Sequence, residues 1–134
     1  MATLANLEGI GKKYAKKLAQ IGIKTTDALL ERGATPKGRK EIEESTGIGH
    51  KLVLEWVNLS DLFRIKGIGE EYSDLLEEAG VDTVVELSKR VPENLYAKII
   101  EINESKKLVR KPPSLSMVAQ WIEQAKVSKR AIEY

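Results

Sequence analysis

Three Gly-Ile-Gly tripeptides, at residues 9–11, 47–49 and 67–69, form the pattern in this chain that could bind a ligand. Two glycines around one aliphatic residue allow a tight backbone reversal, while the aliphatic side chain can fill a core. Where such a turn opens a helix, the first N–H groups of the helix are unpaired and carry partial positive charge. They form a natural seat for an oxyanion. The tripeptides therefore predict phosphate binding by main-chain amides.

Lysines strengthen this prediction at the first turn, and acidic residues weaken it at the third. Cations in the first turn of a helix are unfavourable by about 0.3–1 kcal/mol, because they face the positive end of the helix dipole. Lys12 and Lys13 break this rule, whereas Glu70 and Glu71 obey it. A bound phosphate would offset the repulsion at the lysines. We expect phosphate contacts at the first two turns and a structural or protein-facing role for residues 67–69.

The candidate phosphate-binding residues come from the first two turns and the lysines beside them: Gly9, Ile10, Gly11, Lys12, Lys13, Lys16, Gly47, Ile48, Gly49 and Lys51. Weaker candidates, which could add charge or amides, are Lys37, Arg39, Lys40, Gly67 and Gly69. The alternative interpretation of the lysines is an ordinary solvated helix face. Four Tyr and one Phe offer little for stacking single-stranded bases, so we favour contacts to phosphate.

The composition excludes several kinds of catalytic and metal site. The chain has no Cys and a single His, His50, so it lacks thiol nucleophiles, disulfides and His- or Cys-based metal sites. Adjacent carboxylates, such as Glu43 with Glu44, are expected to be solvated. We therefore predict no catalytic residue, no bound metal in a protein-ligand cluster and no enzymatic activity.

The charge distribution is uneven, although the net charge of +2 is too small by itself to indicate a nucleic-acid partner. Residues 9–17 carry four Lys and no acid, whereas residues 66–86 carry one Lys and seven acids. No run approaches the roughly 18 apolar residues of a membrane span, and the N-terminus lacks the pattern of a signal peptide. We therefore expect a cytoplasmic protein that makes no membrane contact.

An internal repeat organises the chain. A shift of 58 positions places residues 9–11 on 67–69 and Tyr14 on Tyr72, and Trp56 aligns further along with Trp121. The counterpart of the turn at 47–49 has become Pro112-Pro113, which cannot donate amides. The repeat predicts two units, residues 1–62 and 63–134, the second with a degenerate last hairpin. We expect them to pack as one compact body.

The apolar spacing is helical almost throughout, and no segment alternates convincingly as a strand. Thr35-Pro36 and the capping box that begins at Thr83 predict helix starts, and Gly22 and Gly80 predict left-handed helix ends. Loops are expected at residues 46–49, 66–69 and 103–114. The pattern predicts an all-α fold of two units with roughly four to five short helices each. Both tryptophans are expected in the core.

The segment from Leu4 to Leu18, with Gly9-Ile10-Gly11 and Ala15, resembles the helix-hairpin-helix family, and the segments at 42–56 and 62–76 resemble it less closely. The whole chain is also similar to a microbial family of tandem helix-hairpin-helix proteins catalogued as domain-of-unknown-function family 4332. Its shared stretches would be residues 35–39, 56–58, 67–72 and 108–110. The resemblance implies a SAM-like tandem helix-hairpin-helix bundle. It also implies sequence-independent DNA binding, in which turn amides meet phosphates. In that family turn carbonyls sometimes hold a monovalent cation, and we expect no other cofactor.

Two functions from different classes remain open. The first is a non-enzymatic nucleic-acid-binding module, weak and non-specific, that uses the first two turns. The second is a protein-interaction or scaffold module, which would use the acidic helix at 70–78 or the basic segment at 106–111. The sequence identifies no protein partner for it.

Overall fold

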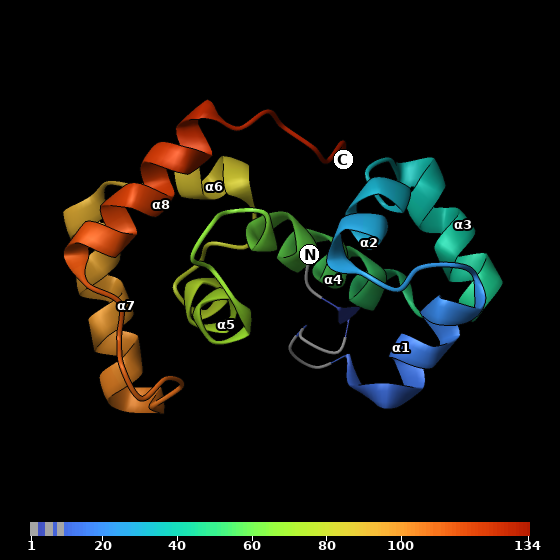
Figure 1. Cartoon of the computed structure of the whole chain (residues 1–134), viewed down its shortest axis with the longest axis horizontal. Helices are drawn as coiled ribbons and strands as arrows, with labels where there is room; N and C mark the ends of the chain where they lie inside the picture. The colour runs from blue at the N-terminus through green and yellow to red at the C-terminus, as the bar shows by residue number, and fades with distance from the viewer. Residues whose placement is uncertain (1–2, 5–6, 8–9) are drawn as a thin grey trace. The chain divides into compact units, whose positions relative to one another are not determined.

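The computed structural model describes residues 3, 4, 7 and 10–134, with the backbone alone at Glu70 and Glu71. Within this part of the chain the regular structure is eight α-helices, and the fold is all-α (Figure 1). One isolated antiparallel bridge joins Thr3 and Thr25. The helices are α1 (Gly11–Gln20), α2 (Thr26–Arg32), α3 (Pro36–Thr46), α4 (His50–Phe63), α5 (Glu70–Glu78), α6 (Val84–Ser88), α7 (Pro92–Lys106) and α8 (Leu115–Val127). No helix of the described residues has the length and apolar character that crossing a membrane requires.

The chain divides into two compact units. Unit 1 is Met1–Arg64 together with Ala131–Tyr134, and unit 2 is Ile65–Arg130. Three pairs of contacting helices correspond between the units: α1 with α3, α2 with α4 and α3 with α4 in unit 1, and α5 with α7, α6 with α8 and α7 with α8 in unit 2. In unit 1, α2 also contacts α3. Each helix of unit 2 therefore takes the place of the helix four positions earlier.

Side-chain caps set several helix starts where the sequence predicts them. Thr35 Oγ1 accepts a hydrogen bond from the Gly38 amide at 3.0 Å, with Pro36 in the first turn of α3. Thr83 Oγ1 accepts from the Glu86 amide at 3.1 Å and starts α6. Such a cap contributes about 1 kcal/mol. Both predicted starts are confirmed.

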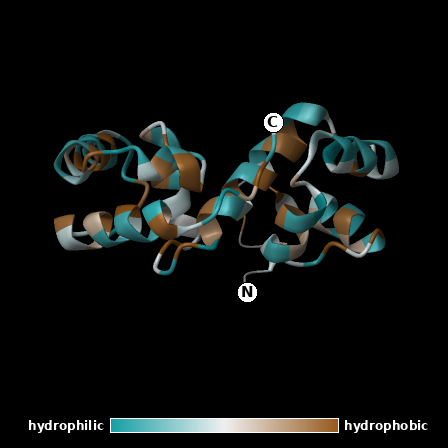
Figure 2. Cartoon of the chain, turned by 90° about the horizontal axis from the view of Figure 1, so that it is seen from above, coloured by the Kyte–Doolittle hydropathy of each residue, from teal (hydrophilic) through white to brown (hydrophobic). Residues whose placement is uncertain are grey.

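The core of unit 1 forms around Trp56, which is 1% exposed. Its ring lies 5.2 Å from that of Tyr14 with the planes tilted by 53°, so α4 and α1 meet through this aromatic pair. Hydrophobic (brown) and hydrophilic (teal) stretches alternate along the helices in Figure 2, as expected for helices that bury one face. The other buried members of the cluster are Leu4, Leu7, Ile10, Leu18, Ile23, Leu29, Ile42, Ile48, Val53, Val57, Leu59 and Ile132.

The core of unit 2 contains the matching pair. Trp121 is 2% exposed, and its ring lies 5.3 Å from that of Tyr72 with the planes tilted by 52°. The prediction that both tryptophans are core residues is confirmed. Because the two pairs have nearly the same geometry, α8 and α5 meet in unit 2 as α4 and α1 meet in unit 1.

The loop predicted at 103–114 is shorter than expected, because α7 continues to Lys106. The Asn103 side chain bonds the loop as it returns: its Oδ1 accepts from the Val109 amide at 3.0 Å and its Nδ2 donates to the Val109 carbonyl at 3.2 Å. Asn103, which the sequence places in a loop, thus lies in the last turn of α7 and hydrogen-bonds the loop that follows.

Candidate phosphate-binding turns

The first turn leads into α1 through a buried isoleucine. Gly9 lies outside the described residues, whereas Ile10 is 1% exposed and fills the core of unit 1. Gly11 has φ +66°, and a Cβ built on it would meet nothing within 4 Å. The glycine is therefore required by the backbone angle alone, and the surface over it is open.

The N-terminal amides of α1 lie in a helical turn that contains no acidic residue. No side chain caps this helix, and its first turn contains no acidic residue. The amides of Gly11, Lys12 and Lys13 donate to no described residue outside the helix. Among the described residues, nothing thus occupies the positive end of the α1 dipole, where an oxyanion would be favoured.

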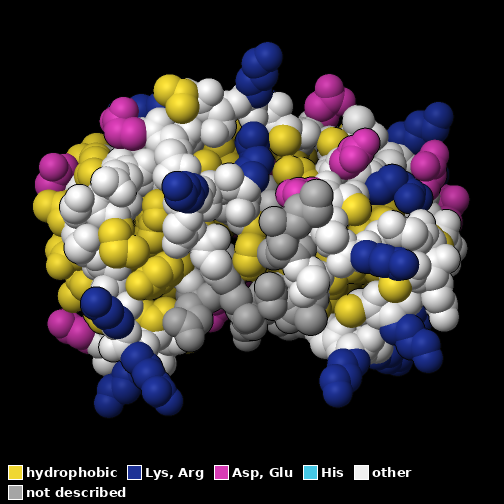
Figure 3. Space-filling view, in the orientation of Figure 1, with side chains coloured by type: hydrophobic (Ala, Val, Ile, Leu, Met, Phe, Trp, Pro, Cys, Tyr) yellow, Lys and Arg dark blue, Asp and Glu magenta, His cyan; other side chains and the backbone are white. Residues whose placement is uncertain are grey.

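Lysine side chains surround this helix end. Lys12, Lys13 and Lys16 are exposed, while Lys17 is half-buried with its Nζ 6.0 Å from the centre of the Tyr14 ring. Basic side chains (dark blue) gather over α1 at the lower right of Figure 3. The four lysines therefore divide between two uses: three extend into solvent, and one packs along the aromatic ring.

The second turn uses most of its amides internally. Gly47 ends α3 in a left-handed conformation, φ +75°, and its N–H donates to the Glu43 carbonyl at 2.8 Å. The Ile48 N–H donates to Thr46 Oγ1 at 3.2 Å. The expectation that the Gly47 amide meets a phosphate is therefore wrong. A helix-ending glycine satisfies a carbonyl of its own helix with that amide.

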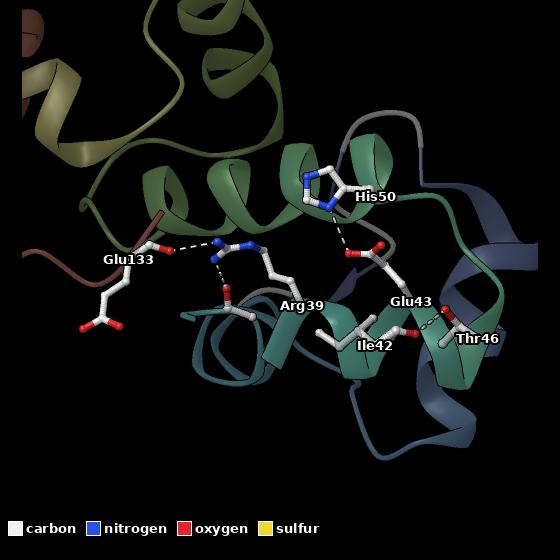
Figure 4. A network of polar contacts seen from close by, with 7 residues as sticks. Arg39, Ile42, Glu43, Thr46, His50 and Glu133 are labelled. Carbon is white, nitrogen blue, oxygen red and sulfur yellow. Dashed lines mark hydrogen bonds and ion pairs between the residues drawn. The ribbon is translucent and has the colours of Figure 1, made fainter. Parts of the chain in front are cut away.

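The groups of the second turn that could still bind an anion are at Gly49 and in the first turn of α4. Gly49 is the extended residue before α4, with no side-chain cap and no acid in the first turn. Lys51 is exposed. A carboxylate nevertheless lies near, because His50 Nδ1 and Glu43 Oε2 are 3.0 Å apart (Figure 4). The second turn is thus less favourable to an anion than the first. The sequence missed this pair, whose only signal is the seven-residue spacing across a tight turn.

The third turn is closed by its own unit. Gly67 has φ +95°, and a Cβ there would come within 3.0 Å of the Trp121 Nε1 atom. The Gln124 side chain accepts from the Lys66 amide at 3.0 Å and donates to the Lys66 carbonyl at 3.2 Å. Residues 66–69 are therefore packed against α8, which fits the structural role expected for them.

Of the weaker candidates for phosphate binding, Arg39 is not accessible to a phosphate. It is 3% exposed, and its Nη1 donates to the Gly33 carbonyl at 2.8 Å. The helical phase explains this, because Arg39 lies three residues before the fully buried Ile42 on the same face of α3. Lys37 and Lys40 are exposed on the rest of the helix. The basic run of α3 therefore offers two surface charges, not three.

A comparison with protein families finds one relationship for most of the chain. A family model described as "Domain of unknown function (DUF4332)" matches residues 8–128. The chain belongs to the DUF4332 family. No curated protein and no solved structure matches it. The match spans all eight helices of this DUF4332 chain and stops before Ala131–Tyr134, the segment that returns to unit 1.

Proposed function

We propose that this DUF4332 chain is a non-enzymatic module that binds nucleic acid without sequence preference, through phosphate contacts at the N-termini of α1 and α4. We also propose that each unit is a double helix-hairpin-helix. The turn between α3 and α4 supports this fold: its first glycine is left-handed, its isoleucine is 3% exposed, and a helix starts directly after its second glycine.

The observation that carries the proposal is the N-terminus of α1. Lys12 and Lys13 are exposed in a helical turn that has no acid and no side-chain cap. Cations there are unfavourable by some tenths of a kcal/mol, so the arrangement is stabilised only when an anion binds. A nucleic-acid phosphate would accept hydrogen bonds from the amides and screen the two ammonium groups from the dipole.

The N-terminus of α4 supplies a second, weaker contact. Gly49 and Lys51 are exposed, but Glu43 beside His50 reduces the attraction for an anion. Two backbone contacts that carry no base readout give affinity without sequence specificity. Dissociation constants of about 10⁻⁴–10⁻⁶ M at physiological salt are typical of such binding.

The test is a fluorescence titration with labelled duplex and single-stranded DNA at two salt concentrations. We expect duplex binding that weakens steeply with salt, because each neutralised phosphate releases counterions. The variant Lys12→Glu/Lys13→Glu should lose most of the affinity and reduce the salt slope by about two, one per phosphate contact. Circular dichroism should show that it remains folded.

The matched control is Lys89→Glu/Lys98→Glu, which makes the same change in net charge on exposed lysines of unit 2. It should leave the affinity near that of the wild type. If both double variants weaken binding equally, net charge governs the interaction and α1 has no special role. If neither weakens it, the proposal is wrong.

One observation favours the alternative, a protein-interaction module. Lys106, Lys107, Arg110 and Lys111 are all exposed around the loop between α7 and α8, where Figure 3 shows basic side chains at the lower left. A pocket of about 460 Å³ lies beside the loop and is lined by Tyr72, Tyr96 and Pro113 among others. An acidic protein segment would suit this surface. A partner retained from nuclease-treated lysate, and lost with Lys107→Glu/Arg110→Glu, would support this function.

A further inference from the structure

The last four residues of the chain pack against unit 1. Ala131–Tyr134 follow unit 2 in sequence but belong to unit 1, and the C-terminus lies near α2 (Figure 1). The segment is not helical. Ile132 is buried, whereas Glu133 and Tyr134 are exposed.

Both main-chain groups of Glu133 are paired with unit 1. Its N–H donates to the Ala34 carbonyl at 2.7 Å. Its carbonyl accepts from Arg39 Nη2 at 2.8 Å (Figure 4). These two bonds recognise the backbone of the segment and do not depend on which side chain stands at position 133.

Two side chains anchor the segment on either side of Glu133. Ile132 is 2% exposed and joins the core cluster of unit 1. Tyr134 donates its hydroxyl hydrogen to Asn58 Oδ1 at 2.7 Å, and its ring centre lies 5.7 Å from the Arg39 guanidinium carbon. The anchors therefore fit an aliphatic residue and a tyrosine two positions apart.

The groove contains polar groups that need an occupant. Arg39 is 3% exposed, no carboxylate of the described residues forms an ion pair with it, and its buried Nε has no hydrogen-bond partner there. Without Glu133, the buried guanidinium would lose one of its two carbonyl partners. Leaving a buried donor unsatisfied costs about 1–3 kcal/mol. An empty groove is therefore unfavourable.

Paired main-chain groups together with anchors at alternate side chains are the features by which proteins bind extended peptides. We propose that unit 1 carries a recognition groove for a short extended peptide of the pattern aliphatic-x-Tyr, and that Ala131–Tyr134 of a second copy of this chain can replace the chain's own segment. The same contacts form in both cases, so exchange requires only that residues 128–130, which lie outside α8, take another path. This function is separate from nucleic-acid binding.

The first arm of the test uses a fluorescent peptide with the sequence of residues 129–134, amidated at its C-terminus, and the full chain carrying Ile132→Asp. That variant removes the anchor from the chain's own segment and leaves the groove intact. The peptide should bind it about tenfold or more tighter than it binds the wild type, where the attached segment competes at high effective concentration. A control peptide with Asp in place of the isoleucine and Ala in place of the tyrosine should not bind.

Equal binding of the peptide to both chains, or binding to neither, overturns the groove. If Ile132→Asp does not fold, Tyr134→Ala serves instead, because it removes an anchor that is itself 61% exposed.

The second arm mixes Ile132→Asp with Arg39→Leu, whose groove is damaged and whose segment is intact. After joint refolding, light scattering should detect a heterodimer in the mixture and monomers of each variant alone. Monomers alone in the mixture, with peptide binding intact, overturn the exchange between copies. Because neither arm measures DNA affinity, the result is independent of the titration proposed above.

Discussion

Unit 1 and unit 2 share one packing scheme and differ in the turns that begin their first helices. The Tyr14–Trp56 and Tyr72–Trp121 pairs have centroid distances of 5.2 and 5.3 Å, although the residues around them differ. The helix starts have diverged: Lys12 and Lys13 stand in α1 where Glu70 and Glu71 stand in α5. The comparison teaches that apolar positions set the fold of each unit, while the polar positions of a single turn decide whether it attracts an anion.

A second difference separates the ends of α3 and α7. Both helices end in a left-handed residue whose amide bonds back four residues, but that residue is Gly47 in unit 1, φ +75°, and Lys107 in unit 2, φ +50°. Lys107 is the single non-glycine residue with positive φ among those described. Unit 2 therefore contains a backbone strain that unit 1 avoids.

The largest expected effect tests whether the two aromatic pairs are equivalent. Trp56→Ala and Trp121→Ala should each lower the free energy of unfolding of their own unit by about 3–5 kcal/mol, because each leaves a cavity beside a buried tyrosine. Urea unfolding followed by circular dichroism measures the loss. Because each unit has one of the two tryptophans, the fluorescence of the one that remains shows that the other unit keeps its stability. The phenylalanine variants are the matched controls and should lose less. A loss below about 1 kcal/mol in either unit would contradict the equivalence, since it would mean that little packing is lost.

A smaller pair of effects, of opposite sign, tests the comparison between the C-terminal ends of α3 and α7. Gly47→Ala should destabilise the chain by about 1 kcal/mol, because a side chain disfavours the left-handed conformation. Nothing lies within 4 Å of the added Cβ to contribute a clash. Lys107→Gly should stabilise it by up to about 1 kcal/mol for the same reason. Urea unfolding measures both, and Lys106→Gly, inside α7, is a control that should destabilise. Effects of the same sign at the two positions would show that strain at Lys107 is unimportant.

The smallest effect concerns the pH dependence of the stability of unit 2, through Asp82. Partial desolvation raises the pKa of the exposed Asp82 carboxyl above its usual value of 3.8. Repulsion from Glu86 adds to the rise, and a backbone hydrogen bond partly offsets it. A carboxyl whose pKa is raised on folding stabilises the fold when protonated, and this contribution is lost as the pH rises through the folded-state pKa. Asp82→Asn should therefore raise the Tm at pH 7, and the difference should vanish at a pH below about 3.9.

Thermal unfolding at several pH values checks the Asp82 prediction. Lys24 holds the corresponding position in unit 1, 58 residues earlier, so Lys24→Gln is the control without a carboxyl at that place. A Tm difference for Asp82→Asn that grows toward acid pH would have the wrong sign for a raised pKa.

Much of the fold could be predicted because it depends on local patterns. The caps at Thr35 and Thr83 and the left-handed conformations of Gly22 and Gly80 follow from rules that involve a few neighbouring residues. The burial of both tryptophans follows from helical periodicity. The C-terminal end of α7 could not be predicted in this way. Asn103 by its residue type favours a loop, but in the structure it lies in the last turn of α7 and its side chain bonds Val109.

The candidate site shows where such local reasoning stops. The exposed Lys12 and Lys13 could be placed from the helical spacing of α1. Arg39 could not, because its place among basic neighbours indicates the surface and only the packing of α3 shows that it faces inward. The Gly-Ile-Gly pattern predicts that the Gly47 amide binds a ligand, whereas in the structure this amide donates to a carbonyl of its own helix.

By itself the sequence determined the all-α class and several helix starts and ends, since helix periodicity, capping and glycine conformation act over a few residues. The tertiary structure alone decided that Ala131–Tyr134 return to unit 1, that Arg39 bonds the Glu133 carbonyl 94 residues away, and that Trp121 closes the turn at Gly67. These contacts join residues far apart in the chain. Their free energy comes from burial and from pairing of buried polar groups, neither of which leaves a periodic signal in the residues involved.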